Sequence, residues 1–332
     1  MTDAPADFEI FLATVPGLEP VLHDEVRNKG FKRPRPVPGG VVLRGGWPEV
    51  WRANLWVRGA GRVLARVAAF RAVHLAQLDD LARRVPWNTV LRPDVPFRVE
   101  ASCARSRLYH SGAVAQRIET AIRESTGAPH DPDAGITVMA RLENDLCTLS
   151  VDTSGEPLHK RGHKEAVNAA PMRETMAALM LHQCGFRGTE PLVDPMCGSG
   201  TFVIEAAAIA ARLNPGRDRH FAFERLRSFD PAEWARMRAA IRGHSSDRNC
   251  VRSWARSCAR APSLTNMPSP RRFSTTPTST RASKARVTVR GLTESSALIC
   301  RTDGRASPSP TAPLRIISMS RWRIWTKMGW LV

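Results

Sequence analysis

A short segment of this sequence, residues 194–201 (DPMCGSGT), combines residue types that suit the binding of a small ligand. Gly198 and Gly200 can adopt positive φ and let a ligand approach the main chain closely. A strand is expected directly before the segment, over residues 191–194. A helix is expected directly after it, over residues 202–213, and its N-terminus offers free N–H groups. Strand, glycine turn and helix in this order predict the opening unit of a doubly wound, nucleotide-binding sheet.

The same segment narrows the class of ligand. Asp194 ends the expected strand, at the edge where open α/β sheets bind ligands, and its carboxylate can pair with a cationic amino group. No Lys-Ser or Lys-Thr follows the glycines, and no GxGxxG pattern is present. Because P-loop and dinucleotide sites depend on those patterns, ATP and NAD are disfavoured as ligands. Cys197 has no basic partner in the motif, which favours a pocket-lining role over that of a nucleophile.

Local patterning predicts the elements that must position this turn. Short strands interleaved with helices, closing on a hairpin, predict an α+β region up to about residue 152. A polar, basic connector over residues 156–164 precedes a helix bracketed by Pro171 and Gly185, which leads into the strand before the glycine turn. Strands are expected over residues 8–14, 41–44, 63–70, 97–101, 136–142 and 146–151, and helices over 18–26, 47–56, 75–85, 111–124 and from 230 onward.

The net charge of +18 comes mostly from the end of the chain. Residues 251–332 contain 13 Arg and 2 Lys but only Glu294 and Asp303 as acids, a net charge of +13. One interpretation is a genuine basic, disordered tail that contacts RNA non-specifically. However, four of the nine tryptophans lie in this tail, and disordered tails contain few such residues. We therefore favour a frameshift near residues 247–251 as the origin of the tail.

The remaining composition indicates a soluble, cytoplasmic protein. The 332 residues, 42% of them hydrophobic, are enough for two ordinary domains. No apolar run approaches the roughly 18 residues of a membrane span, and the acidic start lacks the layout of a signal peptide. The seven cysteines form no CxxC pair, so neither a disulfide framework nor a zinc ribbon is indicated. His159 and His163 lie four residues apart, but Gly162 argues against a helix there, and no metal site is expected.

Several blocks of the sequence together resemble a known family. They are FLATVPGLEPVLHDEV, WRANLWVRGAGRVL, FRVEASCARSRLYHSGAVAQRI and, ahead of DPMCGSGT, LHKRGHKEAVNAAPMRETMAALM. The blocks resemble the class I S-adenosylmethionine-dependent RNA methyltransferases with an N-terminal THUMP domain, in particular the RlmL-type guanine-N2 methyltransferases of large-subunit (23S) ribosomal RNA. The resemblance runs from about residue 8 to about residue 247. It implies S-adenosylmethionine as cofactor and structured RNA of the large ribosomal subunit as partner.

The resemblance also implies a domain order and roles for individual residues. The order is a ferredoxin-like part over residues 1–50, a THUMP RNA-binding domain over 51–154, the start of a Rossmann-like α/β methyltransferase domain over 155–250, and an irregular basic tail over 251–332. Asp247, within HSSDRN, would bind the ribose of the cofactor, because a carboxylate can accept from two vicinal hydroxyls. A surface aspartate in a disordered tail is the alternative. The methionine end of the cofactor would be lined by Asp194, Pro195, Cys197, Gly198, Gly200 and Thr201.

The sequence departs from the family in one important respect. The catalytic signature Asn-Pro-Pro-Tyr is absent, and Tyr109 is the only tyrosine in the chain. In the family, the Asn side chain and a prolyl carbonyl would hold the exocyclic amino group of guanine, and the Tyr would stack on a base drawn out of its helix. We therefore expect no catalytic residues in this chain, no methyl transfer to RNA, and weak or absent binding of S-adenosylmethionine.

Basic residues in two places are candidates for RNA contact. Arg105 and Arg107 lie in the THUMP-like region, and Lys160, Arg161 and Lys164 lie on the connector, where a substrate would pass between the two modules. Arginines on exposed faces are usually just solvated, which is the alternative.

Three hypotheses follow for the function. The first is a product of an RNA guanine methyltransferase lineage whose catalytic half is lost. The second is a non-catalytic RNA-binding THUMP protein with a genuine basic tail. The third, an unrelated metabolite-binding α/β protein, is disfavoured by the matching blocks at both ends of the resemblance.

Overall fold

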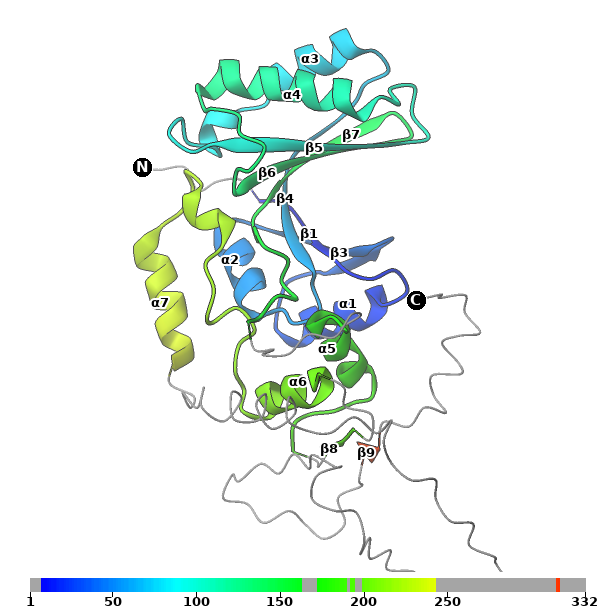
Figure 1. The fold of residues 1–332 in the computed structure, drawn as a ribbon, viewed down its shortest axis with the longest axis vertical. Helices are drawn as coiled ribbons and strands as arrows, with labels where there is room; N and C mark the ends of the chain where they lie inside the picture. Colours follow the sequence, from blue (N-terminus) through cyan, green and yellow to red (C-terminus); the bar gives the residue numbers. More distant parts are fainter. Residues whose placement is uncertain (1–6, 163–171, 190–191, 195–198, 243–314, 317–332) are drawn as a thin grey trace, which may run out of the picture. The chain divides into compact units, whose positions relative to one another are not determined.

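The computed structural model divides into two compact units, and each is described by itself (Figure 1). Within the described residues, unit 1 contains residues 7–162, 172–185 and 212–242, and unit 2 contains residues 186–189, 192–194, 199–211 and 315–316. The chain therefore leaves unit 1, builds part of unit 2, and returns to unit 1. No helix among the described residues is long and apolar enough to cross a membrane.

Unit 1 is built on one mixed sheet of seven strands in the order β2-β3-β1-β4-β7-β6-β5. Neighbouring strands are antiparallel except β5 and β6, which run parallel. The strands are β1 (Phe8–Ala13), β2 (Arg35–Val37), β3 (Gly40–Gly45), β4 (Arg62–Arg71), β5 (Phe97–Ala104), β6 (Ile136–Glu143) and β7 (Leu146–Asp152).

The long strand β4 joins the two halves of this sheet. Its first residues pair with β1, from Arg62 to Ala65, and the strand pairs with β7 from Leu64 to Arg71. The boundary that we expected at residue 50 falls within α2 (Trp47–Trp56), and the hydrogen-bonded sheet continues across both halves.

Helices cover the sheet because each has an apolar stripe. Figure 1 shows α3 (Leu75–Arg83) and α4 (Ser111–Thr126) side by side over the half of the sheet that contains β5, β6 and β7. Residues spaced three or four apart on α4 are completely buried, and Gly127 ends the helix with a φ of 74°. These buried residues are Val114, Ile118, Ala121 and Ile122.

Two later segments return to the first half of the sheet. Helix α5 (Glu174–Gln183) packs against α1 (Glu19–Asn28). The segment with the 3₁₀ turn η2 (Ala222–Arg225) and helix α7 (Pro231–Arg242) adds an aromatic cluster to α2. In this cluster the ring centroids of Trp51 and Phe223 lie 6.1 Å apart. Those of Phe223 and Trp234 lie 5.1 Å apart, with the two ring planes nearly perpendicular.

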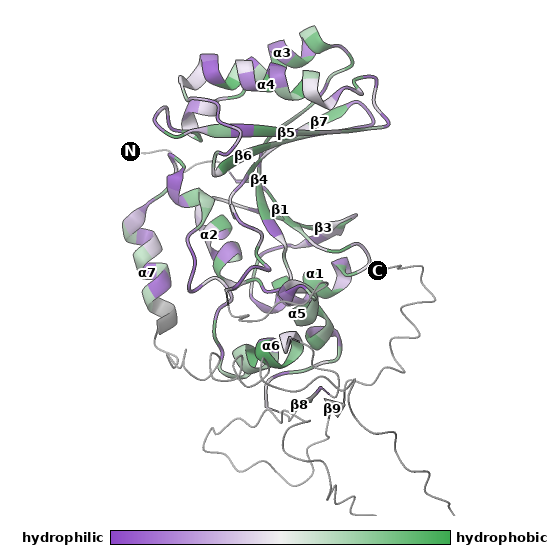
Figure 2. Ribbon diagram, in the orientation of Figure 1, coloured by the Kyte–Doolittle hydropathy of each residue, from purple (hydrophilic) through white to green (hydrophobic). Residues whose placement is uncertain are grey.

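Unit 2 contains the strand and the helix that the glycine-rich segment predicts, and of the turn between them the structure describes Ser199 and Gly200. Strand β8 (Leu192–Val193) pairs in parallel with β9 (Arg315–Ile316), and α6 (Thr201–Ala210) follows the turn. Figure 2 shows that α6 is largely hydrophobic, and its residues from Thr201 to Ala208 are all buried. A helix that is apolar all round belongs in the interior of a fold.

The expected strands and helices agree with the described elements to within a few residues. Four elements were not expected: the edge strand β2, which contains a proline and is only three residues long, the 3₁₀ turns η1 (Trp87–Thr89) and η2, and the two-residue strand β9. Of the tail, the structure describes Arg315 and Ile316, which form β9. The rest of residues 243–332, including Asp247 and the expected frameshift, lies outside the described residues.

Candidate functional site: a glycine turn and a basic loop

In unit 2 the structure describes a buried carboxylate before the glycine-rich segment and the start of a helix after it. Asp194 follows β8 directly and is 8% exposed. Gly200 occupies the N-cap of α6 with a φ of 75°, in the left-handed region that glycine adopts without a steric penalty. The backbone conformation at position 200 therefore agrees with the predicted requirement for glycine there.

The first turn of α6 is shaped for a ligand with acceptor atoms. Gly200 has no side chain to cap the helix, and the helix begins with the bond from the Ile204 N–H to the Gly200 carbonyl at 2.8 Å. The preceding N–H groups of the first turn have no intrahelical partners, so an acceptor of a ligand can bind them. Ser199 Oγ and Thr201 Oγ1 lie 3.3 Å apart at the N-terminus of α6.

The structure describes three of the seven residues expected to bind the cofactor, namely Asp194, Gly200 and Thr201, and all three are buried. The other four lie outside the described residues; they are Pro195, Cys197, Gly198 and Asp247. Lys164, a candidate for RNA contact, also lies outside them.

Arg105 and Arg107 lie in unit 1, in the loop between β5 and α4. The Arg105 side chain is 71% exposed and forms an ion pair with Glu143. Arg105 has a φ of 50°, so the chain turns sharply where the loop leaves β5. The backbone N–H of Arg107 donates to Asp145 Oδ1 at 2.8 Å. Both arginines are thus at the surface, on a loop with a defined course.

The carboxylate of Glu143 stabilises the same corner. Its hydrogen bond with Arg141, together with the charges of Arg141 and Arg105, holds the pKa of Glu143 below its ordinary value. Glu143 therefore stays ionised at neutral pH and orients both arginines.

The connector residues Lys160 and Arg161 occupy different environments. Lys160 is exposed and pairs with Glu156 at 3.3 Å. Arg161 is only 7% exposed, and its Nη2 donates to the Arg58 carbonyl at 2.7 Å. The Arg161 guanidinium thus bonds to the main chain inside unit 1, where burial restricts its access to RNA phosphates.

The segment that contains Arg58 is anchored by a buried carboxylate. Glu25 Oε1 accepts from the Arg58 N–H at 2.7 Å, and Glu25 Oε2 accepts from the Gly59 N–H at 2.9 Å. At Gly59, a Cβ would lie 2.3 Å from a methyl carbon of Leu179 on α5. Glycine therefore permits the close approach of α5 to this segment.

A buried polar network that sequence reasoning missed fixes the exit from the sheet. Asn54 Nδ2 donates to Thr153 Oγ1 at 2.9 Å, and Ser154 Oγ donates to Asn54 Oδ1 at 2.8 Å. Thr153 Oγ1 donates to the Val63 carbonyl at 2.7 Å. Because Asn54 is almost a hundred residues away in the chain, no local pattern could have identified this partnership.

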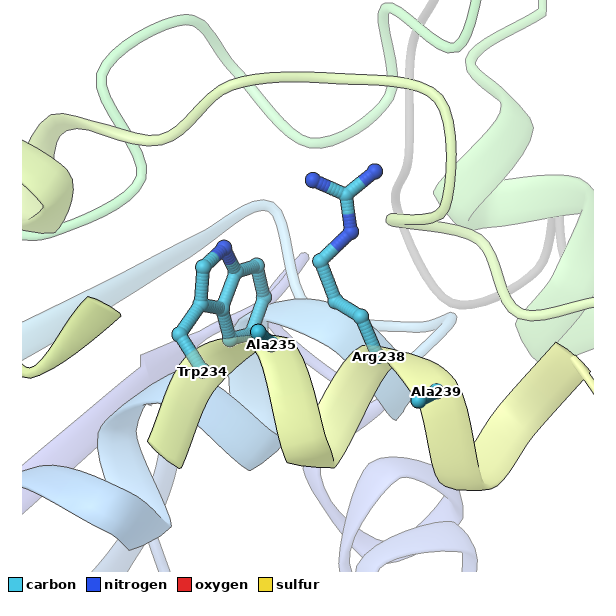
Figure 3. Close-up of a pocket in the computed structure, with 4 residues that line it drawn as sticks. All are labelled: Trp234, Ala235, Arg238 and Ala239. Carbon is cyan, nitrogen blue, oxygen red and sulfur yellow. The ribbon is translucent and has the colours of Figure 1, made fainter. Parts of the chain in front are cut away.

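A shallow cavity of about 210 Å³ lies along α7 in unit 1. Figure 3 shows Trp234 and Arg238 pointing to the same side of the helix, with Ala235 and Ala239 beside them. The Arg238 guanidinium lies 5.8 Å from the centroid of the Trp234 ring. The four residues that line the cavity include no acid and no nucleophile, so we assign the cavity no chemical role. Among the residues that the structure describes, no group of three His, Cys, Asp or Glu side chains could hold a metal ion.

Three family models match consecutive parts of the chain. They are the RlmL ferredoxin-like domain over residues 9–64, the THUMP domain over residues 72–152, and the RMKL-like methyltransferase domain over residues 161–267. The chain belongs to the RlmL-type methyltransferase family. The expected fold class is thereby confirmed, with a ferredoxin-like and THUMP region followed by a Rossmann-like methyltransferase fold.

A curated relative supports the same assignment. This RlmL-type chain is 34% identical over 250 residues to the ribosomal RNA large subunit methyltransferase K/L of Psychromonas ingrahamii. The match covers 72% of this chain and 33% of the relative, so the chain spans about a third of the length of that protein.

Two solved structures share the fold. A predicted N6-adenine-specific DNA methylase from Listeria monocytogenes superposes with a TM-score of 0.66 at 32% identity, covering 71% of this chain and 64% of that chain. SMU.472, solved in complex with SAH, gives a TM-score of 0.66 at 28% identity, covering 73% of this chain and 66% of that chain.

Proposed function

We propose that this RlmL-type chain binds structured RNA of the large ribosomal subunit through its ferredoxin-like and THUMP region. A ribosomal RNA partner would place the chain in the cytoplasm. The observation that carries the proposal is the exposed loop with Arg105 and Arg107, which is hydrogen-bonded to the turn between β6 and β7. Arginines on a loop of fixed course can contact phosphates with little loss of conformational entropy. Lys160, which is exposed on the connector and paired with Glu156, is a separate candidate for phosphate contact.

We further propose that the turn over residues 194–201 is the methionine end of an S-adenosylmethionine pocket. The buried Asp194 carboxylate suits the cationic amino group of the cofactor, and the left-handed Gly200 permits close approach to the main chain. Thr201 adds a hydroxyl at the start of α6. Pro195, Cys197 and Gly198 would complete this end, and Asp247 would accept from the ribose hydroxyls. When bound, S-adenosylmethionine supplies an activated methyl group.

The 332-residue chain is proposed to bind RNA without methylating it. The Asn-Pro-Pro-Tyr signature is missing from the sequence, so nothing orients the guanine amino group toward a methyl donor. A frameshift near residues 247–251 explains this loss together with the unusual tail. The second candidate is a non-catalytic RNA-binding protein with a genuine tail. The exposed loop with Arg105 and Arg107 supports this candidate as well, because RNA binding by the loop does not require the Asn-Pro-Pro-Tyr signature.

Methyl incorporation separates these proposals from an active enzyme. Purified protein is incubated with tritiated S-adenosylmethionine and undermodified ribosomal RNA, beside a version with the reading frame restored. We expect no incorporation by the chain as written and clear incorporation by the restored version. Incorporation by the chain as written would overturn both the proposed defect and the frameshift. The coding DNA distinguishes the two non-catalytic candidates, because the first requires Asn-Pro-Pro-Tyr in another frame downstream of codon 250.

A further inference from the structure

In the described part of the chain, two large hydrophobic side chains are exposed, and both lie at one corner of the THUMP sheet. Tyr109 is 72% exposed and lies in the loop between β5 and α4, which we call the Tyr109 loop (residues 105–110). Leu146 is 41% exposed and begins β7, directly after the turn between β6 and β7. Exposed apolar groups gathered in one place mark an interaction surface more often than scattered ones do.

Two hydrogen bonds hold the Tyr109 loop to that turn, and a third holds the end of β5 to it. The Arg107 N–H donates to Asp145 Oδ1 at 2.8 Å, and the Asp145 N–H donates to Ser106 Oγ at 3.0 Å. The Asn144 N–H donates to the Ala104 carbonyl at 3.3 Å. The loop and the turn therefore form one rigid corner, so ligand binding there orders few additional groups.

The corner is basic. Arg71, Arg105, Arg107 and Arg141 lie on it, and Glu143 and Asp145 are its acids. Glu143 is paired with Arg105 and Arg141, and Asp145 accepts a backbone N–H. Within the described residues the Arg107 guanidinium makes no ion pair, which leaves its charge available for an anionic partner.

The tyrosine ring is presented for stacking. The Tyr109 ring lies 4.1 Å from the ring of His110, centroid to centroid, and most of its surface faces solvent. An exposed aromatic ring among arginines fits an unpaired nucleobase, because the base stacks on the ring and the flanking phosphates pair with the arginines. An apolar protein partner would be a poor match for a corner with four arginines and only two exposed apolar side chains.

We propose that Tyr109 stacks on an unpaired base of the RNA while Arg105 and Arg107 contact the neighbouring phosphates. This inference rests on the proposed RNA-binding function and narrows it to RNA with single-stranded nucleotides at the contact. The corner would then discriminate between duplex RNA and RNA with a flanking or looped-out base.

The test compares two RNAs and three versions of the full chain. The RNAs are a fluorescent hairpin with a single-stranded 3′ extension and the same hairpin with a blunt end. The versions are wild type, Tyr109→Phe, which keeps the ring, and Tyr109→Ala, which removes it. Tyr109→Ala is expected to weaken binding of the extended hairpin about tenfold, because the unpaired base loses the ring on which it stacks. Tyr109→Phe should bind it as wild type does.

The blunt hairpin separates the possible failures. Both variants should bind it with wild-type affinity, and the thermal unfolding of all three proteins should coincide because Tyr109 is exposed. Equal binding of the extended hairpin by wild type and Tyr109→Ala would overturn the stacking proposal while leaving RNA binding intact. An equal loss on both hairpins would also overturn it. If wild type bound neither RNA, the proposed function itself would fail.

Discussion

The main-chain N–H of Arg107 and the side chain of Asp145 meet at 2.8 Å, although 38 residues separate them in the chain. Asp145 has a φ of 62°, in the left-handed region that aspartate tolerates better than most residues. Asp145 therefore serves two purposes. Its backbone adopts the conformation that the turn requires, and its carboxylate accepts a hydrogen bond from the basic loop. The geometry of one turn sets the position of the arginines proposed to contact RNA.

Two substitutions at Asp145 separate these purposes. Asp145→Gly keeps the left-handed turn but removes the acceptor, and we expect several-fold weaker RNA binding because the loop becomes more mobile. Asp145→Asn keeps an acceptor oxygen and should retain wild-type affinity. Fluorescence anisotropy with a structured ribosomal RNA fragment measures both. Equal affinity for the two variants would show that the hydrogen bond does not position the loop.

Arg105→Ala and Arg107→Ala should change the salt dependence of RNA binding. Each phosphate contact that is lost lowers the slope of log K against log salt concentration by about one unit. Arg84→Ala is the matched control, since Arg84 is exposed at the C-cap of α3 and pairs with Asp80 on that helix. An unchanged slope for both loop variants would remove these arginines from the interface.

Arg161 is predicted to stabilise the fold. Arg161→Ala removes a buried guanidinium that bonds to the Arg58 carbonyl, and the free energy of unfolding should fall by about 2 kcal/mol. Lys160→Ala is the control, because Lys160 is exposed and its pair with Glu156 contributes little. Urea denaturation gives both values. Unchanged stability of Arg161→Ala with weakened RNA binding would instead support the direct RNA contact that the sequence suggested.

Cys147 is predicted to be unreactive in the folded sheet. Burial raises the pKa of its thiol to about 12, above the roughly 8.5 of an unfolded cysteine. The folded state therefore disfavours the thiolate. The stability that this shift contributes is complete below about pH 8.5 and is lost as the pH rises through about 12. At pH 9, iodoacetamide should modify the half-buried Cys103 before Cys147, as followed by peptide mass spectrometry; equal rates would contradict the assigned burial.

Local periodicity predicted most of the elements because their apolar residues repeat at helix or strand spacing. The spacing of Val114, Ile118 and Ile122 determines the buried face of α4 without reference to distant residues. Local periodicity could not predict which segments pack against each other. Trp51 packs against Phe223, and Asn54 bonds to Thr153 and Ser154, through contacts between segments far apart in the chain.

The candidate site shows the same division. The left-handed backbone at Gly200 follows from the residue type and from its place before a helix. The difference between exposed Lys160 and buried Arg161 does not, because adjacent basic residues look alike in sequence and only the packing of the connector assigns one to the interior. The importance of Tyr109 required knowledge of its exposure and of the turn that holds its loop.

The most direct test of the central claim is the affinity of the full chain for a structured large-subunit ribosomal RNA fragment across a salt series, measured by fluorescence anisotropy. We expect saturable binding at low salt and a linear fall of log K with log salt concentration, because arginine–phosphate contacts release counterions. Absence of saturable binding at low salt would contradict the account, as would an affinity that does not depend on salt.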